Sequence, residues 1–225
     1  MYVGIVRFPG SNCDFDTLRW FRMHGHSAEF VWHKDQKMRA WDILVLPGGF
    51  AIGDRRYERA TGAFTIDPGA QALNSPVMDA VRAYANAGRP VLGICNGFQI
   101  LVHAGLLPGA LAQNVSGLFF CGSVPCRVEG SSFFRSPKLF GNTFSIPVAH
   151  GYGRYVVDDS LYQTLLSRGQ IFLRYAGGNP NGSCHDIAGV SNEAGTTFGM
   201  MPHPERMRDS RPFMEALEDY VKRNA

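Results

Sequence analysis

The chain has 225 residues, of which 45% are hydrophobic and 18% are charged, and its formal net charge is +3. These fractions are typical of a globular protein with a sizeable core, and the small, dispersed charge contains no basic run that would bind nucleic acid. The chain shows neither a long apolar stretch nor a charged leader, so we expect no membrane or targeting segment. Its five scattered cysteines argue against a disulfide framework and for a reducing compartment, the cytoplasm.

Apolar runs and helical patterns alternate along the chain, which predicts an α/β fold with a layered, mostly parallel sheet flanked by helices. The expected strands cover residues 3–8, 28–32, 43–46, 91–94, 117–128, 143–149, 171–175, 187–191 and 197–200. The expected helices cover residues 14–24, 76–87, 96–106, 160–168 and 211–223. No repeat or linker interrupts the pattern, so we expect one domain over residues 1–225.

The strand at 43–46 leads into the turn Gly48-Gly49-Phe50. Glycines let backbone N–H groups approach a ligand closely, and acyl transfer needs such donors where a carbonyl oxygen becomes negative. We therefore expect the Gly49 N–H to serve an oxyanion hole, although the glycine pair alone would indicate an ordinary β–α turn. Residues 55–74 have no clear period and predict a long functional loop beside this turn. A glycine turn beside such a loop can flip a peptide at low cost, so partner docking would select the active orientation.

Cys95 lies between the apolar strand at 91–94 and the helix that begins at Asn96, in the string Gly93-Ile94-Cys95-Asn96-Gly97. This layout is typical of a nucleophile elbow, in which a tight turn exposes the nucleophile at a helix N-terminus. The helix dipole there favours a thiolate, and the Asn96 N–H can supply a second oxyanion donor. A buried structural cysteine would leave both flanking glycines unexplained.

A nucleophilic cysteine needs a base, and the base needs a residue that orients it. His203 and Glu205 stand two residues apart between Pro202 and Pro204, which restrict the backbone. A His-x-Glu triplet alone is more often a surface loop, but together with the elbow it predicts a Cys95, His203 and Glu205 catalytic set. The acid follows the histidine here, whereas it precedes the histidine in serine α/β-hydrolases.

Gln99 is one helical turn after Cys95 and is our candidate for binding the substrate, with bracing of the elbow as the alternative. His150 either contacts the amino-acid end of that substrate or ends a strand. We expect no metal site, because the adjacent Cys184 and His185 lack the usual ligand spacing. The chain has neither a phosphate-binding loop with lysine nor a dinucleotide-binding glycine motif, so we expect it to activate no acceptor with ATP.

These motifs resemble the class I, triad-type glutamine amidotransferases, and more closely the glutaminase subunits (subunit I) of phosphoribosylformylglycinamidine synthases. The closer resemblance is carried by residues 8–14 (FPGSNCD), 95–101 (CNGFQIL), 104–109 (AGLLPG), 174–175 (RY), 179–183 (NPNGS) and 200–206 (MMPHPER). Two stretches depart from it. Tyr152 stands in His150-Gly151-Tyr152-Gly153, where the family usually has Glu, and residues 50–54 read FAIGD instead of the usual FSYGD.

The resemblance implies a flavodoxin-like sheet and a glutaminase that splits L-glutamine into glutamate and ammonia through a Cys95 thioester. It further implies that ammonia passes to a large, ATP-dependent synthase subunit, often accompanied by a third small subunit. That subunit makes formylglycinamidine ribonucleotide from formylglycinamide ribonucleotide in purine biosynthesis. We expect no cofactor in this chain, with ATP and Mg²⁺ on the partner. The alternatives are a stand-alone cysteine hydrolase, the glutaminase of another synthase, and a non-catalytic binding domain of the same fold.

Overall fold

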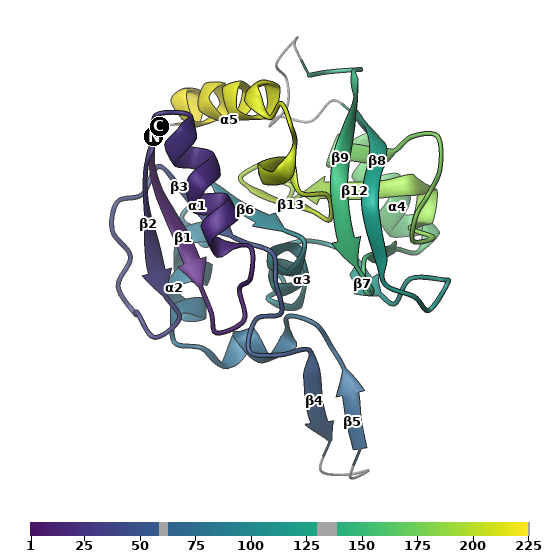
Figure 1. The fold of residues 1–225 in the computed structure, drawn as a ribbon, viewed down its shortest axis with the longest axis horizontal. Helices are drawn as coiled ribbons and strands as arrows, with labels where there is room; N and C mark the ends of the chain where they lie inside the picture. The colour runs from purple at the N-terminus through teal and green to yellow at the C-terminus, as the bar shows by residue number, and fades with distance from the viewer. Residues whose placement is uncertain (59–62, 130–138, 225) are drawn as a thin grey trace.

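The computed structural model describes residues 1–58, 63–129 and 139–224, and its centre is a nine-stranded sheet (Figure 1). In spatial order its strands are β2 (Ser27–Trp32), β1 (Tyr2–Arg7), β3 (Ile43–Leu46), β6 (Val91–Ile94), β13 (Thr197–Met200), β12 (Ile187–Ser191), β11 (Ile171–Tyr175), β8 (Phe120–Val128) and β9 (Thr143–His150). The predicted α/β class, with a large sheet and flanking helices, is confirmed.

The sheet has a parallel half and an antiparallel half. Strands β2, β1, β3, β6 and β13 pair in parallel, whereas β13, β12, β11, β8 and β9 pair antiparallel. Every residue of β3, β6 and β13 is buried, as continuous apolar runs in covered parallel strands should be. The expectation of a mostly parallel sheet therefore holds for one half only. A short turn joins β12 to β13 without a crossover helix, and such a connection requires antiparallel pairing.

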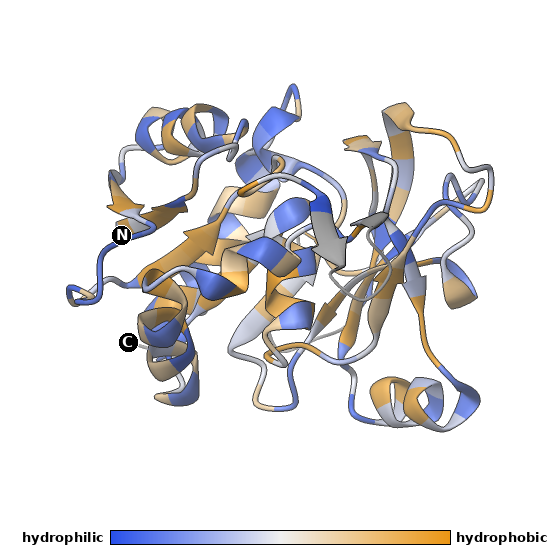
Figure 2. Ribbon diagram, turned by 90° about the horizontal axis from the view of Figure 1, so that it is seen from below, coloured by the Kyte–Doolittle hydropathy of each residue, from blue (hydrophilic) through white to orange (hydrophobic). Residues whose placement is uncertain are grey.

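Helices cover both faces of the parallel half, as Figure 1 shows, with α1 in front of the strands and α2 and α3 behind them. The helices are α1 (Asp14–Met23), α2 (Val77–Asn86), α3 (Asn96–His103), α4 (Asp159–Ser167) and α5 (Arg211–Asn224). Figure 2 shows apolar residues along the strands and alternating polar and apolar stripes on the helices, as amphipathic packing requires. Among the helices of the described segments, none is long and apolar enough to cross a membrane.

The segment 55–74 is not the loop that the sequence predicts. Its described residues form a hairpin of β4 (Arg55–Glu58) and β5 (Ala63–Ile66), followed by the 3₁₀ helix η1 (Ala70–Asn74). Figure 1 shows the hairpin projecting away from the main sheet. Two further short strands, β7 (Ala110–Ala112) and β10 (Arg154–Val156), pair with each other, and η2 (Cys184–Asp186) and η3 (Pro204–Arg206) are single 3₁₀ turns. The sequence gives no periodic signal for elements this short.

Candidate active site

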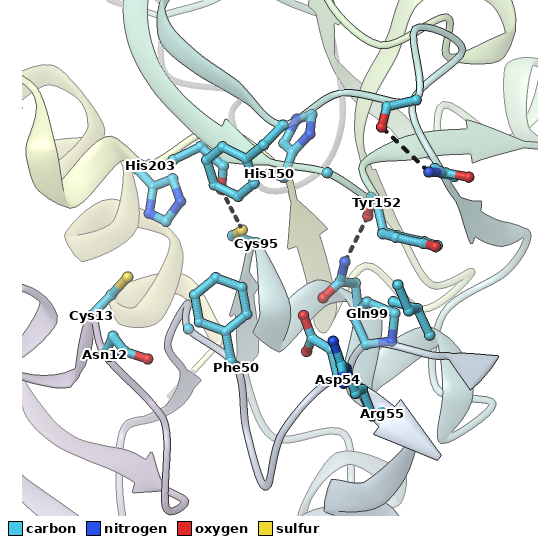
Figure 3. Close-up of a pocket in the computed structure, with 18 of the residues that line it drawn as sticks. Asn12, Cys13, Phe50, Asp54, Arg55, Cys95, Gln99, His150, Tyr152 and His203 are labelled. Atoms are coloured by element: carbon cyan, nitrogen blue, oxygen red, sulfur yellow. Dashed lines mark hydrogen bonds between the residues drawn. The ribbon is translucent and has the colours of Figure 1, made fainter. Parts of the chain in front are cut away.

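Cys95 occupies a strained turn between β6 and α3. Its backbone has φ 51° and ψ −106°, and residues other than glycine rarely adopt such a positive φ. Gly97 makes the close crossing possible, because a Cβ there would lie 1.9 Å from the Leu46 carbonyl oxygen. The Cys95 N–H donates to the Met200 carbonyl at 2.7 Å, and the thiol contacts the Ala149 carbonyl at 3.6 Å (Figure 3). The turn therefore presents the thiol at the N-terminus of a helix, as the elbow motif predicts.

The sheet topology brings His203 to Cys95 across the sequence. Strands β6 and β13 are parallel neighbours with Ile94 opposite Met200, so the residues that follow each strand emerge at the same edge. A Cβ on Gly48 would lie 2.8 Å from His203 Cε1 and 3.4 Å from Cys95 Cβ, which shows that both side chains line one small space. Figure 3 shows the imidazole on the Cys95 side of the pocket.

Glu205 holds the imidazole in one orientation. His203 Nδ1 lies 2.6 Å from Glu205 Oε1, and the two side chains are only 2% and 0% exposed. Within the described part of the chain, His203 Nε2 and Glu205 Oε2 have no hydrogen-bond partner. Burial disfavours the imidazolium, but the charges of Glu205 and Cys95 outweigh burial and raise the pKa of His203 to about 10. His203 therefore holds its second proton strongly, and Nε2 is the ring nitrogen left to exchange a proton with Cys95.

The Gly48-Gly49-Phe50 turn follows β3 at the same edge of the sheet. The Gly48 carbonyl accepts from the Cys13 N–H at 3.1 Å, and the Phe50 N–H donates to the Gly10 carbonyl at 2.7 Å. Gly49 has φ +140°, and no described residue accepts a hydrogen bond from its N–H. The Gly49 N–H is therefore the donor that this turn leaves available, whereas Phe50 contributes a half-exposed ring at the pocket mouth.

Asn96 and Gln99 connect the elbow to the segments on both sides of it. The Asn96 side chain accepts from the Ala51 N–H at 3.0 Å and donates to Gln99 Oε1 at 2.8 Å. Gln99 Nε2 in turn donates to the Tyr152 carbonyl at 2.6 Å (Figure 3). Both ends of the Gln99 amide are thus occupied by protein groups, which favours the bracing interpretation over direct substrate binding.

His150 is buried beside the pocket and is held by two asparagines. Its Nδ1 lies 3.1 Å from Asn114 Oδ1 and its Nε2 lies 3.4 Å from Asn181 Nδ2. Burial, together with the positive charge of His203, lowers the pKa of His150 to about 4, so the ring is neutral at physiological pH. A Cβ on Gly153 would lie within 2.6 Å of the ring, at 2.4 Å from Cε1. His150 is also the last residue of β9, so its position agrees with the prediction that it ends a strand.

A pocket of about 580 Å³ lies at the carboxyl ends of the parallel strands, where α/β sheets bind ligands, and its lining includes Gly49, Phe50, Cys95, Gln99, His150 and His203. Sequence reasoning missed two titratable residues that line this pocket, Cys13 and Asp54. Burial raises the pKa of the Cys13 thiol to about 12, which makes it a poor nucleophile beside Cys95. Ligand atoms of Cys13, His203 and Glu205 lie within 4.8 Å of one another and are the candidate metal group among described residues. In that group the His203 imidazole and the Glu205 carboxylate are already joined by a hydrogen bond.

Comparisons with known proteins agree with this geometry. Residues 1–216 match the family described as CobB/CobQ-like glutamine amidotransferase domain. Phosphoribosylformylglycinamidine synthase subunit PurQ of Thermus thermophilus is 48% identical over 212 residues, covering 91% of this chain and 89% of that protein. The same subunit of Synechococcus elongatus is 45% identical over 218 residues, covering 93% and 91%. The structure of PurLQS from Thermotoga maritima aligns with TM-score 0.83 and 37% identity over 98% of each chain.

Proposed function

Since the chain belongs to the family of CobB/CobQ-like glutamine amidotransferase domains, we propose that it is the glutaminase subunit of a phosphoribosylformylglycinamidine synthase. The observation that carries the proposal is the convergence of Cys95, His203 and Glu205 at one edge of the sheet. Each of the three lies in a motif that the sequence shares with glutamine amidotransferases. The substrate is L-glutamine, and the product that leaves for the partner is ammonia.

Before the attack, the Cys95 proton lies on His203 Nε2, because the raised pKa of His203 favours an imidazolium beside a Cys95 thiolate. The thiolate then attacks the side-chain amide carbon of glutamine, and the carbonyl electrons move onto oxygen. The N–H groups of Gly49 and Asn96 stabilise that oxyanion, a contribution of about 10²–10³ in rate for each donor. As the tetrahedral intermediate collapses, the His203 imidazolium protonates the leaving nitrogen and the C–N bond breaks. Ammonia departs, and a γ-glutamyl thioester remains on Cys95.

Water completes the cycle. His203 removes a proton from a water molecule that attacks the thioester carbonyl, the oxyanion forms again, and the C–S bond breaks. The Cys95 sulfur recovers its proton and glutamate is released. Glu205 stabilises the imidazolium in both half-reactions and fixes its tautomer, as the acid of a hydrolytic triad does.

The acceptor chemistry belongs to the partner subunits in this proposal. Ammonia released into water at neutral pH is largely protonated and loses its nucleophilicity, so it needs a docked acceptor site. The similar proteins include a synthase subunit and a PurLQS assembly, which supports a large subunit and a small third subunit as partners. We assign ATP and Mg²⁺ to the large subunit. We further propose that residues 1–225 form one glutamine amidotransferase domain and that the complex works in the cytoplasm.

The test measures glutamine-dependent and ammonia-dependent synthesis by the reconstituted complex. The His203→Ala variant should lose glutamine-dependent synthesis and should retain the ammonia-dependent reaction, because that chemistry lies on the partner. Glu205→Ala should lose less than His203→Ala. Loss of both activities in His203→Ala would contradict this division of labour. A full glutaminase rate without any partner, and no ammonia transfer with it, would favour the stand-alone hydrolase.

A further inference from the structure

The glutaminase pocket must recognise both charges of its substrate. Glutamine carries an α-ammonium and an α-carboxylate, and an amidase that ignores them cannot distinguish glutamine from other primary amides. Among the pocket-lining residues that the structure describes, Asp54 is the sole carboxylate. It lies between the oxyanion turn and β4, and Figure 3 shows its carboxylate pointing into the pocket below Cys95.

One oxygen of the Asp54 carboxylate lacks a partner among the residues that the structure describes. Its Oδ1 atom is buried and has no hydrogen bond to any described residue. Burial raises the pKa of Asp54, so the surroundings of this carboxylate do not compensate for its charge. Buried polar atoms in native proteins are normally hydrogen-bonded, and an exception at a pocket wall points to a ligand group.

The cations that the structure describes near Asp54 do not pair with it. Arg206 lines the pocket but directs its guanidinium to Asp16, with Nε and Nη2 at 2.9 and 2.7 Å from the same carboxylate oxygen. Arg55 is exposed at the pocket rim and forms no described ion pair with Asp54. Asp54 therefore faces the pocket as an anion that a bound cation would neutralise.

A backbone acceptor at the pocket wall is already engaged. The Tyr152 carbonyl already accepts from Gln99 Nε2 at 2.6 Å. We propose that Asp54 binds the α-ammonium group of L-glutamine, an assignment that rests on the proposed glutaminase function.

The test compares glutamine with glutaramate, the same γ-amide without the α-amino group, as substrates of the complex with the large subunit. Wild type should prefer glutamine in kcat/KM by about 10- to 100-fold, the range for a hydrogen bond between charged groups. Asp54→Asn should lose about this factor with glutamine and little with glutaramate. Equal losses with both substrates, or no loss with either, would overturn the assignment.

Two further measurements make the result specific to Asp54. Arg55→Gln changes the neighbouring charge and should keep the preference for glutamine over glutaramate, because Arg55 cannot bind an ammonium. Asp54→Asn without substrate should melt at the same or a higher temperature, since it removes a buried, unpaired charge. A lower melting temperature would indicate a structural role. If wild type released no ammonia from glutamine, the proposed function itself would fail, whatever Asp54 does.

Discussion

Glu205→Gln separates the charge of the triad acid from its geometry. The His203 Nδ1 to Glu205 Oε1 distance is 2.6 Å, and an amide oxygen in the same place can still accept the Nδ1–H hydrogen bond. The substitution therefore keeps the orientation of the imidazole and removes one buried negative charge. What it should change is the proton affinity of His203.

The size of this change follows from the short distance and the burial of the pair. Two unit charges about 4 Å apart interact by roughly 4 kcal/mol at an effective dielectric constant of about 20. One pKa unit corresponds to about 1.4 kcal/mol, so the pKa of His203 should fall by about three units from its value of about 10. At pH 8 the imidazolium fraction would drop from nearly complete to about one tenth. The pKa of His203 in the folded protein lies above its ordinary value of 6.5. The stability that its protonation gives the folded state is therefore complete below pH 6.5 and is lost as pH rises through about 10.

The direct assay is an NMR titration of histidine Cε1 resonances, with the His203 signal assigned by its loss in His203→Gln. Glu218→Gln is the matched control, because Glu218 Oε1 contacts His26 Nε2 at 2.9 Å, outside the pocket. It should lower the pKa of His26 and leave that of His203 unchanged. A His203 pKa that moves by less than one unit in Glu205→Gln would refute the electrostatic argument.

Two other outcomes test the elbow. A glutamine-analogue electrophile should label one thiol per chain, that of Cys95. Burial raises the pKa of the neighbouring Cys13 thiol to about 12 and keeps it protonated. Peptide mapping that places the label on Cys13 would contradict the assignment. Gly97→Ala should destabilise the fold by about 3 kcal/mol or more, beyond the usual range for overpacking, because its Cβ would meet the Leu46 carbonyl oxygen at 1.9 Å. Denaturant unfolding measures this loss, and an unchanged midpoint would show that α3 can move away from β3.

The parallel half of the sheet and the elbow could be predicted because their signals are local. Strands β3 and β6 are continuous apolar runs, and each ends in a glycine turn that the sequence displays. Cys95, His203 and Glu205 each stand in a short motif, so their types and spacing indicate the chemistry. Their meeting in space then follows from the parallel pairing of β6 with β13.

The residues that escaped prediction depend on contacts between distant segments. Cys13 reaches the pocket only because residues 9–13 lie against the Gly48-Gly49 turn. No local sequence pattern predicts that contact. Asp54 ends the stretch 50–54, which carries no catalytic pattern, and its buried Oδ1, without a partner among the described residues, becomes visible only in three dimensions. The sequence indicates Gln99 and His150 as site residues, but the partners of their polar atoms, Tyr152, Asn114 and Asn181, lie in distant segments.

The contact between residues 9–13 and the Gly48-Gly49 turn also bears on how a partner could activate this subunit. The sequence suggests a glycine turn that flips freely beside a long loop, but the structure anchors both peptides around Gly49. The Gly48 carbonyl accepts from Cys13 N–H and the Phe50 N–H donates to Gly10, while a Cβ on Gly49 would lie 2.4 Å from Asn12 N. Reversing either peptide breaks one such bond, at about 0.5–1.5 kcal/mol, and meets a tightly packed neighbour. A partner that stimulates hydrolysis therefore has a more direct route through the β4–β5 hairpin, which continues from Asp54, than through a flip of the oxyanion turn.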